Sequence, residues 1–104
     1  MKPQTKFKKA VIKLAASFGL TVTLHESMSG YDSRTKEGWT TFRLLTDQAP
    51  ADEFLTQLEE LNQTVFSGVH AISGLPAKVR LAVRNMTING VQNTFCNGVL
   101  TQVG

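Results

Sequence analysis

Two segments with the alternation of a half-buried strand, Leu20 to Leu24 and Trp39 to Thr46, place the strongest constraint on how this chain can fold. Apolar and polar side chains that follow one another with a period of two indicate a strand with one face in the core. The first segment continues to Met28, and the residues that follow it, Ser29 to Gly38, are polar and rich in turn formers. The pattern therefore predicts a β-hairpin with a connecting loop at Ser29 to Gly38.

Pairing of this hairpin about Ser33 satisfies the alternation on both strands. Leu24 then faces Phe42 and Val22 faces Leu44 on the core side, and a slip of one residue would turn these side chains toward water. The same register gathers the remaining side chains on the outer side, where Thr21, Thr23, His25 and Ser27 oppose Leu45, Arg43, Thr41 and Trp39.

Helices are expected on either side of the hairpin. The first is predicted from Lys6 to Phe18, because its apolar residues recur on one stripe at helical spacing. Thr5 is a suitable N-cap, and Gly19 can end the helix in the left-handed conformation. The second helix is predicted from Pro50 to Asn62, where a proline at the start precedes two acidic residues in the first turn.

The C-terminal part reads as strands joined by tight turns. Asn-Gly at positions 89–90 and 97–98 is a strong two-residue turn signal. The predicted strands are Val65 to Ser73, Lys78 to Ile88, Val91 to Cys96 and a short final segment, Val99 to Val103. We therefore expect one α+β domain over residues 1–104, with an antiparallel sheet of about five strands, two helices on one face, and the order α-β-β-α-β-β-β.

The composition and the N-terminal residues indicate the cellular compartment in which the protein is expected. Cys96 is the single cysteine among 104 residues, so no intrachain disulfide can form, and the net charge of +3 is a mild excess. Lysines followed by the apolar stretch from Ala10 to Leu24 resemble an export signal faintly, but Lys13 interrupts that stretch. We interpret it as a folded helix and expect a cytoplasmic protein with no membrane span.

The chemistry of catalysis is missing from the sequence motifs. The two histidines, His25 and His70, fall in different predicted strands, and HExxH, CxxC, GxSxG and a glycine-rich phosphate loop are absent. Glu26 points away from its neighbours His25 and Ser27, because adjacent strand residues face opposite sides. We expect no enzyme, no cofactor and no bound metal, and we interpret His70 as an ordinary strand residue.

Aromatic and cationic residues gather on the first hairpin. Trp39 and Arg43 share its outer side with His25, and the connecting loop adds further aromatic and basic residues. The candidate binding residues are Tyr31, Arg34, Lys36, Trp39, Arg43 and His25, with the helix lysines Lys6, Lys9 and Lys13 as an electrostatic extension. Tryptophan, tyrosine and arginine are enriched at protein interfaces, and aromatic rings among cations also suit single-stranded nucleic acid.

These residues favour a non-enzymatic small binding module, a protein-interaction regulator or inhibitor of a size that phage or plasmid genes often encode. Single-stranded nucleic-acid binding by the basic and aromatic hairpin face is the first alternative. A structural or assembly subunit is the second, in which Val99 to Val103 forms a sheet edge that pairs with another copy. The same side chains also suit a solvated surface without a partner.

Overall fold

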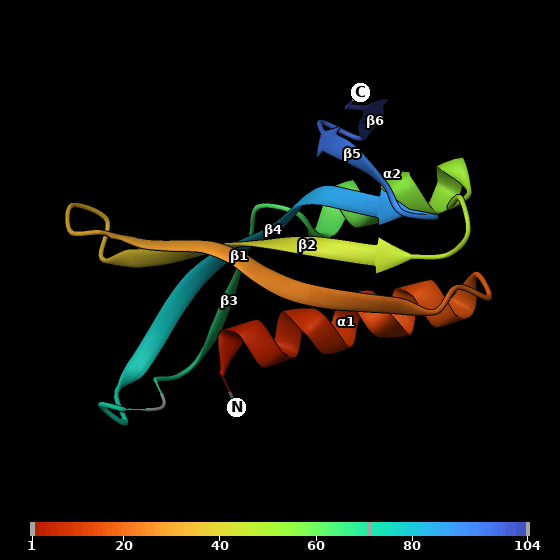
Figure 1. Cartoon of the computed structure of the whole chain (residues 1–104). Coiled ribbons are helices and arrows are strands. Elements are labelled where there is room, and N and C mark those ends of the chain that lie inside the picture. The colour runs from red at the N-terminus through yellow and green to blue at the C-terminus, as the bar shows by residue number, and fades with distance from the viewer. Residues whose placement is uncertain (1, 71, 104) are drawn as a thin grey trace.

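The computed structural model describes residues 2–70 and 72–103. Within them, two helices and six strands follow the order α1-β1-β2-α2-β3-β4-β5-β6 (Figure 1). The helices are α1 (Pro3–Ser17) and α2 (Asp52–Leu61), and the strands are β1 (Val22–Asp32), β2 (Glu37–Thr46), β3 (Thr64–Val69), β4 (Pro76–Ile88), β5 (Val91–Cys96) and β6 (Val99–Gln102). Neither helix is long and apolar enough to cross a membrane.

The first helix starts earlier than the sequence pattern predicted. It begins at Pro3, because a proline in the first turn loses no hydrogen bond and already has a helical φ. Thr5 therefore lies inside the helix, and its predicted role as N-cap is wrong. Gly19, with a φ of 72°, ends α1 as expected, and the Leu20 amide donates to the Ala15 carbonyl at 2.9 Å.

The sheet is mixed, which corrects the prediction of a purely antiparallel sheet. Its order is β1-β2-β4-β5-β6, and β2 runs parallel to β4. The chain leaves β2 through α2 and then forms β3, so β4 returns beside β2 in the same direction. Parallel neighbours require a long crossover of this kind, whereas the short turns that the sequence showed join antiparallel strands.

Strand β4 is the centre of the sheet and has two different partners on the side away from β2. Its first half pairs with β3 and its last residues pair with β5. Between these partners the side chain of Asn62 replaces a strand: the Val83 amide donates to Asn62 Oδ1 at 2.9 Å, and Asn62 Nδ2 donates to the Val83 carbonyl at 3.2 Å. Arg84 follows as a bulge against β2.

The register of the first hairpin differs from the prediction by two residues. Leu24 pairs with Leu44 instead of Phe42, and Val22 pairs with Thr46 instead of Leu44. Because the shift is even, the side chains of β2, and those of β1 up to Glu26, keep the faces predicted for them. The strands also continue through most of the predicted loop, up to the Asp32–Glu37 pair, and a bulge at Ser27 changes the alternation of β1 beyond that point.

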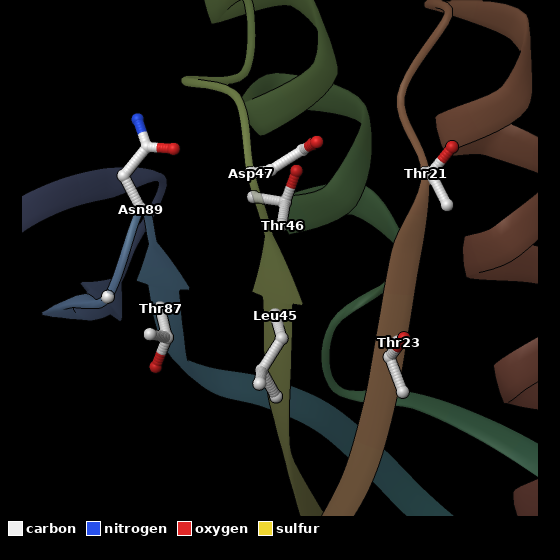
Figure 2. A pocket seen from close by; sticks show the side chains of 8 residues that line it. Thr21, Thr23, Leu45, Thr46, Asp47, Thr87 and Asn89 are labelled. Carbon is white, nitrogen blue, oxygen red and sulfur yellow. The ribbon is translucent and has the colours of Figure 1, made fainter.

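Both helices pack on one face of the sheet, as predicted, and the α+β class is confirmed. Phe7 of α1 lies 5.2 Å from Phe42 of β2 between ring centroids, and Phe18 meets Phe54 of α2 edge to face at 5.8 Å. No helix of the described residues covers the opposite face. Figure 2 shows this open face with α1 and α2 behind the strands. A shallow hollow of about 400 Å³ lies on it, where β1 begins and β2 and β4 end.

A candidate binding cleft between two hairpin arms

Two hairpin ends project from the body of the molecule and diverge (Figure 1). We call residues 28–40, the outer ends of β1 and β2, the first arm, and residues 66–70 and 72–79, the outer ends of β3 and β4, the second arm. Pairing between β2 and β4 begins at Gly38 and Val79, so beyond this pair the arms separate. A cleft of about 560 Å³ opens between them, and Gln4 at the start of α1 lines it as well.

Polar side chains hold the base of this cleft together. Thr40 is buried there, and its hydroxyl lies 3.1 Å from the hydroxyl of Ser29 on the neighbouring strand. Gln4 Nε2 donates to the same Thr40 oxygen at 3.4 Å. The first arm is thereby tied to the beginning of α1, which limits how far the arm can swing.

Trp39 is oriented by its partner in the hairpin. It pairs with Gly30 across the two strands, and a Cβ atom built on Gly30 would overlap Cζ2, Cε2 and Nε1 of the indole. The ring therefore lies directly against the glycine backbone, an arrangement in which an aromatic side chain covers a cross-strand glycine. With 39% of its surface exposed, Trp39 borders both the cleft and a smaller hollow beside Glu37 and Arg80.

A short turn closes the first arm. The Lys36 amide donates to the Asp32 carbonyl at 2.8 Å, and Lys36 itself has a φ of 58°. The Asp32 carboxylate accepts from the Arg34 amide at 2.9 Å and lies 3.9 Å from the Arg34 guanidinium. Arg34 thus stands at the exposed tip of the arm, whereas Lys36 is among the residues that line the cleft.

His70 organises the turn of the second arm, and its interpretation as an ordinary strand residue is wrong. Its Nδ1 accepts hydrogen bonds from the amides of Ile72 and Ser73 at 3.3 and 3.2 Å. Its own amide donates to the Leu75 carbonyl at 2.9 Å. Because Nδ1 is an acceptor, the ring proton of the neutral imidazole is on Nε2, which remains free to donate. The spacing of His70 from Gly74 is the sequence signal that could have indicated a turn.

Exposed apolar side chains concentrate on the two arms. Ile72 is 93% exposed and Tyr31 is 66% exposed, values that are unusual for side chains of this size. The exposed apolar residues of the arms are Met28, Tyr31, Trp39, Val69, Ile72 and Leu75. Sequence reasoning missed those of the second arm, because Gly-Leu-Pro at 74–76 indicated only a break between strands.

The lining of the cleft is basic. Lys36 enters from the first arm and Lys78 from the second, and no carboxylate occurs among its described lining residues. Arg80 lies outside this lining and has other partners: it donates to Glu37 at 3.3 Å and to the Gln63 carbonyl at 2.9 Å. The two lysines therefore dominate the charge inside the cleft.

The predicted binding residues are divided among four places. Tyr31, Lys36 and Trp39 line the cleft, and Arg34 lies at the tip of the first arm. His25 and Arg43 pair with each other on the open face of the sheet. Lys6, Lys9 and Lys13 are on α1, behind the sheet, and the Lys6 ammonium donates to the Ser67 carbonyl at 2.6 Å. The helix lysines therefore cannot extend the surface around Arg43.

Comparison of the chain with known proteins identifies no relative. No protein-family model, no curated protein and no solved structure matches the chain. Among the described residues, no three histidine, cysteine, aspartate or glutamate side chains are grouped so that they could hold a metal ion.

Proposed function

We propose that this protein is a non-enzymatic binding module that holds a segment of a partner protein between its two arms, as a small regulator or inhibitor would. The observation that supports the proposal is the cleft whose two sides each carry a largely exposed apolar side chain, Leu75 at 65% on one arm and Tyr31 at 66% on the other. Exposed apolar groups around a concave site are typical of interaction surfaces.

Binding of a partner at the arms would be favourable because it removes these apolar side chains from water. Each square ångström of apolar surface that a partner covers contributes about 25 cal/mol. The side chains of Leu75 and Ile72 do not hold their turn in the free protein, since hydrogen bonds of His70 already do so. A polypeptide with apolar side chains would bury them together with Tyr31.

A protein partner suits the arms better than a nucleic acid. Aliphatic side chains such as those of Ile72 and Leu75 neither offer a ring on which a base can stack nor bind a phosphate. The alternation of the strands places Tyr31 and Trp39 on opposite faces of the first arm, so their rings do not form one continuous stacking platform although both residues border the cleft.

Selection from a library of displayed peptides tests the proposal. We expect peptides that bind the wild-type protein and lose about tenfold in affinity with Leu75→Ser or Tyr31→Ser. Ile12→Ser and Val99→Ser are matched controls, because these apolar residues are also exposed but lie on α1 and β6. Selected peptides that respond to the control substitutions as strongly as to the arm substitutions would refute the arms as the binding site.

A further inference from the structure

We infer that the polypeptide held between the arms is acidic, with a carboxylate that meets Lys36 and Lys78 and an apolar neighbour that packs against Tyr31 and Leu75. The inference rests on the proposed function and names the chemistry of the partner. All four residues line the same cleft, and they come in pairs of one cation and one apolar side chain from each arm.

The positive charge of the cleft favours an anionic group in the ligand. Lys36 and Lys78 approach it from opposite arms, and in the described part of the chain neither forms a salt bridge. Two cations that face one cleft repel each other, and a carboxylate between them converts this repulsion into two attractions. The two described salt bridges join Arg34 to Asp32 and Arg80 to Glu37. Neither includes a lysine, so both lysines remain available.

The polar atoms of the second arm add directed donors. His70 lines the cleft, and its Nε2–H is the ring donor that the turn does not use, because Nδ1 accepts from Ile72 and Ser73. A donor of this kind suits a carboxylate or a backbone carbonyl of an extended peptide. Gln4 at the base already donates to Thr40 and is committed to the fold.

The apolar part of the lining indicates that the anion belongs to a protein. Leu75 and Pro76 from the second arm and Tyr31 from the first form a wall that a free anion or a phosphate chain would leave exposed. A peptide in which acidic and aliphatic side chains alternate presents both kinds of group to the two arms. Nucleic acid would need a row of phosphate contacts, and the cleft offers two lysines.

Fluorescence anisotropy with three labelled probes tests the inference on the full chain. The probes are a short peptide of alternating glutamate and leucine, its glutamine–leucine analogue, and oligothymidine of similar length. We expect the glutamate peptide to bind about tenfold more tightly than the glutamine peptide, and its affinity to fall as salt is added. Both results use the unaltered protein and do not depend on the folding of a variant.

Charge reversal then locates the site. Lys36→Glu combined with Lys78→Glu should abolish the preference for the glutamate peptide. Lys9→Glu combined with Lys13→Glu makes the same change in net charge on α1, away from the cleft, and should retain the preference. Circular dichroism of each double variant verifies that the fold is intact.

The outcomes separate this inference from the proposed function. Equal affinity for the two peptides, with loss of both on Leu75→Ser, would overturn the acidic partner and leave the protein-binding module intact. Tighter binding of oligothymidine than of either peptide would overturn both. Equal effects of the two lysine pairs would show that the attraction depends on net charge, and would overturn the assignment to the cleft.

Discussion

The indole of Trp39 lies directly against the backbone of Gly30, its cross-strand partner in the first hairpin. No side chain larger than hydrogen fits at position 30 while the ring stays in place. The pair therefore explains why a glycine occurs inside β1, where it would otherwise weaken the strand. It also fixes the position of the one tryptophan relative to the cleft.

Replacement of this glycine should displace the ring. Gly30→Ala is expected to cost about 1–3 kcal/mol in the free energy of unfolding, since the added methyl overlaps three atoms of the indole. Urea denaturation followed by tryptophan fluorescence measures both the stability and the exposure of the ring. Gly38→Ala is the matched control, because a Cβ there meets its nearest atoms at 3.5 Å, an ordinary contact. Equal stability of Gly30→Ala and the wild type would contradict the described packing.

The side chain of Asn62 should contribute to stability as a substitute for a strand. Asn62→Ala leaves the amide and carbonyl of Val83 without their partner between β3 and β5, and we expect a loss of about 1–3 kcal/mol. Asn62→Asp retains the oxygen that accepts from the Val83 amide, so its loss should be smaller. Thermal or chemical denaturation of the three proteins gives the order. An aspartate variant less stable than the alanine variant would show that this hydrogen-bond pair is not the cause.

The imidazole of His70 should determine the local stability of the second arm. His70→Ala removes the acceptor of the Ile72 and Ser73 amides, so hydrogen exchange at these two amides should become faster. His70→Asn is expected to restore part of the protection, because its side-chain oxygen can accept from amides two or three residues ahead. His25→Ala, a change in an exposed residue of β1, serves as the control. Unchanged exchange in His70→Ala would exclude the ring as the organiser of this turn.

Glu59 should anchor the last hairpin to α2. Its Oε2 accepts from the Gly98 amide at 3.1 Å, in the turn between β5 and β6. Glu59→Ala is therefore expected to cost about 1 kcal/mol and to increase hydrogen exchange in β6. Glu60→Ala removes the same charge from the exposed side of the helix and should leave β6 protected. A similar effect of both substitutions would indicate helix electrostatics instead of the contact with Gly98.

Local signals in the sequence were sufficient for much of the fold. Asn-Gly at 89–90 and 97–98 predicted tight turns, and both pairs have the positive φ angles that these turns need. Alternation predicted the faces of β2, and of β1 up to Glu26, correctly, because an even shift in register leaves these faces unchanged. The same alternation could not choose between registers two residues apart, and it gave no sign of the bulge at Ser27.

The candidate site was predicted only in part. Tyr31, Lys36 and Trp39 were recognised as unusual from their residue types, and they line the cleft. Their partners on the second arm, Leu75 and Lys78, were not, because nothing local in the chain relates a turn near residue 74 to one near residue 34. Arg43 was grouped with the site because it shares the outer side of the hairpin with Trp39, and it lies further along the open face, outside the lining of the cleft. The helix lysines were added for their charge alone, and the fold places them on α1.

The sequence by itself determined the helices, most strands, the tight turns and the faces of the first hairpin outside the bulge, since all of these depend on neighbours within a few residues. Tertiary structure alone decided that β4 lies beside β2 in parallel, because parallel neighbours are joined by a long crossover, here through α2 and β3, and the place where such a crossover returns depends on contacts between residues far apart in the chain. That parallel pairing brings the two hairpins together at Gly38 and Val79 and lets them diverge beyond. The cleft exists for this reason, and no local pattern could have shown it.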